Sequence, residues 1–269
     1  MPRGTTPLDV WRGPAARRLL HPVSLNRDIA RRIERPEDKR AYVRDLFAGV
    51  AHRYDLTNDV LSLGLHRRWK RRLLELADIR AGQTVLDLAA GTGDLARGAI
   101  EAAGGDLAVV AADLTPEMMR VGTRRKGPAL DGWIAADAGS LPFADGRFDR
   151  VLIGYGLRNF ARLERCLAEV LRCLKPGGRL VALDFGHPPH PGFGRAYRGY
   201  LEVATRAVGW ALHRDAESYV YILESLRRFP GQRGVQRLME EVGYARAGFE
   251  DLWFGTMGIN YGERPEAGS

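Results

Sequence analysis

The chain has 269 residues, of which 45% are apolar, and this composition suits a single globular domain that buries a full hydrophobic core. No run reaches the roughly 18 to 20 apolar residues that a membrane span needs, so we expect a cytoplasmic protein with peripheral membrane contact at most. The two cysteines, Cys166 and Cys173, fall about 10 Å apart along one predicted helix, which predicts free thiols and no disulfide.

Positive charge is concentrated near the start of the chain. Residues 1–40 hold ten Lys and Arg against five acids and so contribute +5 of the net charge of +8. A denser cluster, HRRWKRR, follows at 66–72. Such clusters attract nucleic acid, acidic lipid headgroups or phosphorylated substrates, and a merely solvated basic surface is the alternative. We treat residues 1–35 as a basic N-terminal extension.

Hydrophobic periodicity predicts strands that alternate with helices along the chain. Short β-rich runs of this kind occur at 84–89, 108–114, 132–137, 148–156 and 179–185. The helix expected over 163–174 ends at a Lys-Pro-Gly-Gly stretch, and two last runs, 245–252 and 255–261, predict a hairpin. This order predicts a doubly wound, Rossmann-like α/β fold with a seven-stranded, mostly parallel sheet and a C-terminal antiparallel hairpin.

The long segment after the fifth strand, residues 186–230, is predicted to be a helical insertion. Its apolar residues recur at helical spacing, among them Phe193, Tyr197 and Tyr200, and Asp215 is placed to cap a second helix. Aromatic helices at the rim of the sheet suit a flat ring with an isoprenoid tail. The alternative is a subdomain core that binds no ligand.

The stretch TVLDLAAGTGDLA, residues 84–96, places a glycine loop between the first strand and a helix. Read from Gly91 to Ala96, it fits a dinucleotide fingerprint, with Asp113 about twenty residues later to bind a ribose. Read from Asp87 to Gly93, it is similar to the first motif of class I methyltransferases, whose glycine loop passes under the methionine end of S-adenosylmethionine. The loop alone leaves both interpretations open.

Acidic residues also end the next two predicted strands. Asp113 closes the second strand, where its carboxylate can accept both hydroxyls of a ribose. Asp137, followed by the small Ala138, could hold the amino group of an adenine. For either aspartate, the alternative role is a helix N-cap. That role becomes less probable because three acids, Asp87, Asp113 and Asp137, end three successive strands beside a glycine loop.

Three stretches resemble the ubiquinone/menaquinone biosynthesis C-methyltransferase family: YDLTNDVLSLGLHRRWK at 54–70, IGYGLRNF at 153–160 and EVLRCLKPGGRLVALDF at 169–185. The similarity extends from about Leu46 to Gly262. It implies a class I methyltransferase domain over 36–269, with a helical lid at 36–80 and an acceptor-side insertion at 186–230. S-adenosylmethionine is then the implied cofactor.

The resemblance also implies individual cofactor contacts. They are Asp87, Gly91, Thr92, Gly93, Asp113, Asp137 and Ala138, together with Tyr54 of the lid signature, which includes Asp55 and Asn58. Two positions depart from the family pattern. Gly154 stands where a serine is common, and FGTMGINYGE at 254–263 replaces an Ala-Leu-His-x-Gly pattern, which we expect to bear on acceptor recognition.

Catalysis is assigned by the resemblance to Arg158, Asn159 and Asp113. A ring carbon becomes nucleophilic when a quinol hydroxyl loses its proton, so the site needs a base or a cation that stabilises the phenolate. Arginine stays protonated at ordinary pH, so we assign Arg158 to phenolate stabilisation, with Asn159 as a neutral partner. A structural pair between Arg158 and a surface acid is the alternative. His187, after the fifth strand, is a second candidate base.

We therefore predict a C-methyltransferase that converts demethylmenaquinol to menaquinol. A methyltransferase of the same family with another phenolic or polyketide acceptor is the main alternative, and a binding module with a degenerate pocket is another. An amine or adenine N-methyltransferase would show an Asn/Asp-Pro-Pro-aromatic tetrad where this chain has GYGLRN, so nucleic acid is not an expected partner. An NAD-dependent oxidoreductase would need a substrate domain that the sequence lacks. No metal is expected.

A polyprenylated quinol resides in a bilayer, so we expect the protein to dock peripherally on an anionic inner-membrane surface. The predicted contacts are the extension 1–35 and the cluster HRRWKRR, in which Trp69 would place an interfacial aromatic among cations. The alternative is that these cations only solubilise the protein or hold its lid closed.

Overall fold

A seven-stranded sheet forms the centre of the protein. The structure is a computed structural model that describes residues 29–53, 59, 62, 64–208 and 217–266. The strand order is β3-β2-β1-β4-β5-β7-β6, with β7 antiparallel to both β5 and β6. The strands are β1 (Thr84–Leu88), β2 (Ala108–Asp113), β3 (Gly132–Ala135), β4 (Phe148–Gly154), β5 (Leu174–Phe185), β6 (Ala245–Leu252) and β7 (Met257–Glu263). The predicted Rossmann-like architecture with a terminal antiparallel hairpin is confirmed.

Helices cover both faces of this sheet. On one face lie α4 (His66–Ala77) and α5 (Asp94–Ala102), and on the other lie α7 (Leu163–Cys173) and α10 (Gly231–Val242). Each face has its own hydrophobic core, because successive residues of a strand point to opposite sides. In β4, for example, Val151 and Ile153 belong to the core under α7, whereas Leu152 belongs to the core under α4.

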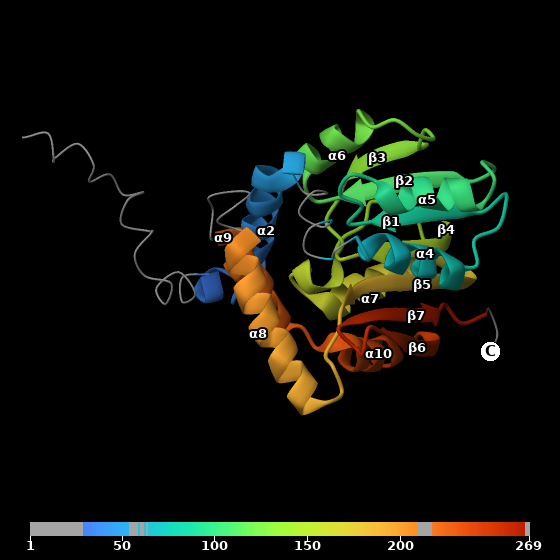
Figure 1. Ribbon diagram of the computed structural model, residues 1–269. Coiled ribbons are helices and arrows are strands. Elements are labelled where there is room, and N and C mark those ends of the chain that lie inside the picture. Colours follow the sequence, from blue (N-terminus) through green and yellow to red (C-terminus); the bar gives the residue numbers. More distant parts are fainter. Residues whose placement is uncertain (1–28, 54–58, 60–61, 63, 209–216, 267–269) are drawn as a thin grey trace, which may run out of the picture.

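A third group of helices stands beside one end of the sheet. Figure 1 shows α2 (Pro36–Val50), α8 (Pro191–Val208) and α9 (Glu217–Arg228) together on the left of the view, with α6 (Pro116–Thr123) above them. The short helix η4 (Leu157–Asn159) follows β4 and contacts α9. This is the edge where the parallel strands end, so helices from the beginning and the later part of the chain meet where a ligand is expected.

Several predicted strand boundaries differ from the structure by a few residues, and two of them have a clear physical reason. The strand expected from Arg179 begins at Leu174, directly after α7, because Leu174 pairs with Phe148 before the Lys-Pro-Gly-Gly stretch shifts the register. The last strand begins at Met257 and not at Gly255. The reason is a tight turn, in which Gly255 has a φ of 80° that extended strand geometry excludes. The expected cap Asp215 lies outside the described residues.

Phe148 provides a test of the core under α7. Its side chain is fully buried and meets Phe143 edge-on, with ring centroids 5.0 Å apart. Phe148→Ala should lower the free energy of unfolding by about 3–5 kcal/mol, because it removes a large buried side chain and leaves a cavity. Urea unfolding measures this, with the exposed Phe193→Ala as control, for which we expect a change of about 0.5 kcal/mol or less. Equal losses for the two variants would contradict this description of the core.

Candidate active site

Two loops with left-handed backbone meet at the ends of β1 and β4. Ala89 and Tyr155 have φ values of 56° and 62°, which are strained for residues with a side chain. They are packed closely, since a Cβ added at Gly156 would come within 2.8 Å of the Cβ of Ala89. Backbone strain and close approach therefore coincide where the two central strands end.

A cavity that opens to solvent lies against these loops. Its polar side chains are those of Arg40, Asp113, Thr115, Asp137, Tyr155 and Asn159. The apolar part of its lining consists of Val43, Phe47, Leu88, Ala89, Leu114, Met118, Ala136, Ala138, Phe160, Ala161 and Cys166. An apolar slot with a few acids suits an adenosine.

Asp113 is buried at the end of β2 and accepts two backbone hydrogen bonds. Gly91 N–H donates to its Oδ2 and Thr115 N–H to its Oδ1, both at 2.7 Å. Burial raises its pKa, and these hydrogen bonds act in the opposite direction. The carboxylate thus fixes the glycine loop while its remaining lone pairs can face the cavity that it lines.

Asp137 also lines the cavity, and its carboxylate forms an ion pair with a residue of helix α2. Arg40 of α2 approaches its Oδ2 with Nη1 at 2.9 Å, while Gly139 N–H donates to its Oδ1. The neighbouring Ala138 is buried and lines the cavity, as a small residue beside a ring would. An adenine amino group at Asp137 would therefore share the carboxylate with Arg40.

A second hollow lies on the other side of the glycine loop. Its lining includes Asp87, Thr92 and Lys70 of α4, and it shares Ala89, Gly91, Gly154 and Tyr155 with the first cavity. Asp87 accepts Ala96 N–H at 2.9 Å through Oδ2, but its buried Oδ1 has no partner in the described part of the chain. An unsatisfied buried acceptor of this kind fits the ammonium group of a bound amino acid.

Gly93 and Gly154 have structural reasons to lack side chains. A Cβ at Gly93 would lie 2.5 Å from Trp133, and Gly93 has a φ of 76° where α5 begins. Gly93 is absent from the lining of both hollows, and its predicted cofactor contact stays a prediction. A Cβ at Gly154 would lie 2.7 Å from Leu95, so this packing explains the departure from serine.

Arg158 is buried on η4 in an ion pair with Asp184. Its Nη1 donates to Asp184 Oδ1 and to the carbonyl oxygen of Tyr155, both at 2.8 Å. The guanidinium also lies over the ring of Phe185, 4.9 Å from its centroid. It is not part of the lining of the first cavity but lies near Tyr197 and Tyr221; burial raises the pKa of both tyrosines, and the charge of Arg158 opposes this. The acid that pairs with Arg158 is buried and is not the surface acid of the structural alternative.

Asn159 connects the cavity to the α9 helix. Its Nδ2 donates to the carbonyl oxygen of Tyr155 at 3.0 Å, and its Oδ1 accepts the hydroxyl of Tyr221 at 2.9 Å. Tyr221 is buried against Tyr42 of α2, with ring centroids 5.5 Å apart. Asn159 is therefore held directly by α9, and α2 packs against α9 from a distant part of the sequence.

Lys39 is a site residue that the sequence analysis missed. Its Nζ donates to the carbonyl oxygens of Arg158 at 2.9 Å and Phe160 at 2.7 Å. Burial lowers its pKa to about 8. Lys39 and Arg40 fall in the basic segment 1–40, and nothing in a run of charged residues shows which of them reach the site. The same holds for Lys70 in the cluster HRRWKRR.

Other predicted residues lie outside these hollows. His187 is exposed, with its ring against Gly231 and Nε2 3.4 Å from the carbonyl oxygen of Leu226, so nothing brings it to the cavity. Cys166 and Cys173 are free thiols, as predicted, and both are buried; Cys166 lines the first cavity, and burial raises its pKa to about 12. The lid residues Tyr54, Asp55 and Asn58 lie outside the described residues.

The cluster HRRWKRR is less available than its composition suggests. Trp69 is half-buried in the core under α4 and packs against Trp253, so it is not the freely exposed interfacial aromatic that was predicted. Three of its cations are paired with acids: Arg67 with Asp59, Lys70 with Asp94, and Arg72 with Glu75 and Glu250. Among the described helices, none is long and apolar enough to cross a membrane.

The sequence profile of the ubiE/COQ5 methyltransferase family matches residues 35–264. A ubiquinone/menaquinone biosynthesis C-methyltransferase UbiE from Pseudomonas putida (strain GB-1) is 41% identical over 235 residues, which cover 86% of this chain and 92% of the relative. The UbiE of Dinoroseobacter shibae is 40% identical over 232 residues, which cover 85% and 92%.

Solved structures show the same fold at low identity. A chain from the Haloferax volcanii complex of the Trm112 methyltransferase activator has a TM-score of 0.62 and 17% identity, covering 84% of this chain and 99% of that one. Phosphoethanolamine N-methyltransferase 2 of Haemonchus contortus, solved with S-adenosyl-L-methionine, has a TM-score of 0.53 and 14% identity, covering 74% and 53%.

The sheet order, the glycine loop and the family match together define a class I methyltransferase that uses S-adenosylmethionine. More particularly, the chain belongs to the ubiE/COQ5 methyltransferase family. The dinucleotide interpretation of the glycine loop is thereby set aside.

Asp113→Ala should abolish measurable binding of S-adenosylmethionine, with a loss of at least roughly 100-fold in affinity. The variant would lose the predicted ribose contact and also the hydrogen bond that holds Gly91, which together should cost about 3 kcal/mol or more. Isothermal titration calorimetry measures the affinity, and a thermal melt confirms that the variant is folded. Asp145→Ala, a change at an exposed acid that pairs with Arg172 and lines neither hollow, is the matched control. Unchanged affinity in a folded Asp113→Ala variant would remove the ribose assignment.

Asp87→Asn should remove a decrease in the free energy of unfolding that the parent protein shows as the pH rises. Burial raises the pKa of Asp87 from 3.8 to about 7, so the folded chain keeps a proton that the unfolded chain has lost. The free energy of unfolding of the parent therefore falls as the pH rises from about 4 to 7, and the variant should lack this fall. Urea unfolding without cofactor should show a larger advantage of the variant at about pH 8 than at about pH 5. An advantage that does not change with pH would show that Asp87 is ionised throughout.

Proposed function

We propose that this chain methylates a ring carbon of a prenylated quinol, and specifically that it converts demethylmenaquinol to menaquinol. The observation that carries the proposal is the position of Arg158: a buried guanidinium beside aromatic rings, one residue away from the lining of the cofactor cavity. Relatives at 40–41% identity bear the name ubiquinone/menaquinone biosynthesis C-methyltransferase, which supports the same acceptor class.

The two joined hollows would receive the two halves of the cofactor. In the larger cavity, Asp113 would accept the ribose hydroxyls and Asp137 the adenine amino group beside Ala138. In the smaller hollow, the unpartnered Oδ1 of Asp87 would face the ammonium group of the methionine moiety. Lys70 lines the same hollow and would attract its carboxylate. The backbone of Gly91 and Thr92 would pass between the two halves of the cofactor. Tyr54 would be a further cofactor contact.

When bound, the cofactor supplies a methyl group on a positively charged sulfur. The chain's own residues then have to orient the acceptor and favour its deprotonated form. Arg158 would stabilise the phenolate oxygen electrostatically, which is most effective in a site with little water. Asn159 lines the cavity and is fixed by Tyr155 and Tyr221, so it can position the ring without changing charge.

Helix α2 would act as the lid of this site. Its residues Arg40, Val43 and Phe47 line the cofactor cavity, and Lys39 binds the carbonyl oxygens of η4. The helix therefore contacts the adenosine side through Arg40 and the acceptor side through Lys39. Closing it would exclude water from both at once.

The main alternative is a methyltransferase of the same family that acts on another phenolic or polyketide acceptor. One reason for it is the segment FGTMGINYGE at 254–263, which departs from the family pattern. In the structure, Asn260 of that segment donates to the carbonyl oxygen of Gln232, and a Cβ at Gly258 would lie 2.7 Å from the Gln232 side chain. These contacts pack α10 on β7 and involve no residue of either hollow. The departure therefore gives this alternative no support from the described contacts.

The test is an incubation of the chain with S-adenosylmethionine and a panel of acceptors. The panel contains reduced demethylmenaquinones of different tail lengths, reduced ubiquinone precursors and simple phenols, and mass spectrometry detects the gain of one methyl. We expect the demethylmenaquinols to react. Reaction of phenols alone would establish the other acceptor class, and cofactor binding without any product would favour the binding module.

Arg158→Lys should reduce turnover by roughly 10²–10³-fold while the affinity for S-adenosylmethionine stays within a few-fold. Lysine keeps the charge beside Asp184, whereas alanine would leave that buried carboxylate without its partner and cost about 3–5 kcal/mol of stability. Arg165→Lys is the matched control, because Arg165 also donates to a backbone carbonyl but is exposed. Near-normal turnover of the folded Arg158→Lys variant would move the catalytic role to another residue.

A further inference from the structure

The strongly exposed large apolar side chains of the described residues all lie in one region. They are Phe193 at 42% exposure, Tyr200 at 50%, Val203 at 71%, Trp253 at 56% and Phe254 at 80%. The first three belong to α8, and the last two form the turn between β6 and β7. Single exposed apolar residues are ordinary on a protein surface, but their concentration in one place marks a contact site.

Helix α8 presents these residues as a stripe. Phe193, Ala196, Tyr200 and Val203 follow one another at spacings of three, four and three residues, and all four are exposed. The helix is held to the protein by another side, where Gly194 and Leu201 are buried. One side of its exposed surface is therefore an apolar stripe, whereas a surface helix normally shows polar residues there.

The β6–β7 turn displays its two aromatics in a strained but fixed backbone. Trp253 and Phe254 have φ values of 48° and 55°, a region that bulky residues avoid. Thr256 N–H and its hydroxyl both bond the carbonyl oxygen of Trp253, and Gly186 N–H donates to Thr256. Strain at exposed aromatic residues has no benefit for folding, and it is typical of functional positions.

The turn and the helix form one surface at the site edge of the sheet. Phe254 meets Phe193 with ring centroids 5.6 Å apart, and Trp253 meets Trp69 at 6.4 Å. Since Phe185 at the end of β5 pairs with Met257, the turn lies at the carboxyl edge, where the cofactor cavity also lies. We call this surface, made of Phe193, Ala196, Tyr200, Val203, Trp253 and Phe254, the rim patch.

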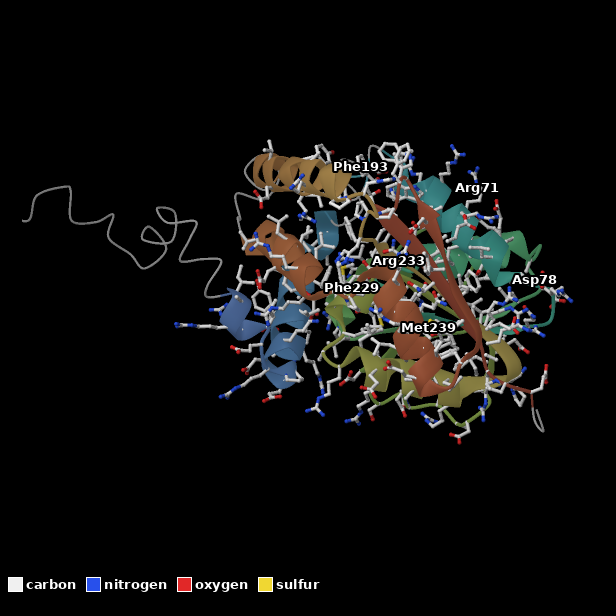
Figure 2. The ribbon with its side chains drawn as sticks, turned by 90° about the horizontal axis from the view of Figure 1, so that it is seen from below. Arg71, Asp78, Phe193, Phe229, Arg233 and Met239 are labelled. Carbon is white, nitrogen blue, oxygen red and sulfur yellow. The ribbon has the colours of Figure 1, made fainter. Side chains whose placement is uncertain are left out.

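Cations flank the rim patch. Arg195 and Arg198 extend from α8, and Arg68 and Arg71 from α4; all four are exposed, and none has an ion pair within the described residues. Figure 2 shows Phe193 and Arg71 along the same edge of the molecule. An acid on α8, Glu202, is engaged by Arg227.

We propose that the rim patch is the surface by which the protein docks on an anionic lipid bilayer. The proposal rests on the proposed function, because a prenylated acceptor has to be taken from a membrane. Aromatic residues suit the bilayer interface, and unpaired arginines around them attract anionic headgroups. A second copy of the chain would bring the same four cations against themselves, so charge complementarity favours lipid over self-association.

The test is sedimentation of the full chain with vesicles of phosphatidylglycerol and phosphatidylcholine, compared with vesicles of phosphatidylcholine alone. We expect binding to the anionic vesicles only, weakened by salt. The variant W253N/F254G replaces the turn residues by the pair that left-handed turns prefer, so it should fold at least as well. Its partitioning should fall roughly tenfold or more, and Y200S/V203S should show a similar loss.

Charge is tested separately. R195E/R198E should lower the partitioning into anionic vesicles at low salt. The control R124E/R237E makes the same change at two other exposed arginines, Arg124 at the end of α6 and Arg237 on α10, and should lower the partitioning much less. Thermal melts check that each variant is folded. Unchanged vesicle binding by W253N/F254G and Y200S/V203S would overturn the proposal. A change in oligomeric state, seen by light scattering, without any vesicle binding by the parent would also overturn it and would indicate contact between copies.

Turnover separates this proposal from the proposed function. All patch variants should methylate a short-tailed, water-soluble quinol as the parent does, but should be slower with a long-tailed quinol in anionic vesicles. If the parent methylates no quinol while the variants still lose vesicle binding, the acceptor assignment fails and the docking surface stands. If the variants use the long-tailed quinol in vesicles at the parental rate, the docking surface fails and the acceptor assignment stands.

Discussion

The site depends on the parallel pairing of β1 with β4. The chain runs outward from β1 through β2 to β3 and then returns to place β4 on the other side of β1. The connections that follow β1 and β4 therefore leave in opposite directions, which opens a crevice between them. Ala89 and Tyr155, both left-handed, line this crevice, and the two hollows meet there. A different strand order would separate the glycine loop from the Arg158 segment.

Helix α2 couples the two sides of that crevice. Arg40 neutralises Asp137 on the cofactor side, while Lys39 holds the carbonyl oxygens of the segment that carries Arg158. Binding of an adenine at Asp137 would disturb the first contact and so affect the helix that makes the second. Two adjacent basic residues would thus connect cofactor binding at Asp137 with the arrangement of the proposed catalytic group.

The proposed docking surface and the cavity share the carboxyl edge of the sheet. The β6–β7 turn reaches this edge because β7 is antiparallel to β5, and α8 reaches it because it starts soon after β5 ends. A bilayer at the rim patch would therefore lie next to α8 and α9, the helices beside Arg158. An acceptor ring could then enter the site while its tail remains in lipid.

The sequence by itself determined the fold class, the positions of the strands and the residues at their ends. Periodicity is a local property, so Asp87, Asp113 and Asp137 could be found at strand ends from the chain alone. Boundaries that depend on pairing, such as the start of β5 at Leu174, could not. Only the tertiary structure decided which basic residues reach the site: Lys39, Arg40 and Lys70 at the two hollows and the η4 segment, and Arg158 against the buried Asp184. It also decided that Trp69 packs against the core under α4. These outcomes depend on burial and on partners distant in sequence, and neither is encoded in the spacing of neighbouring residues.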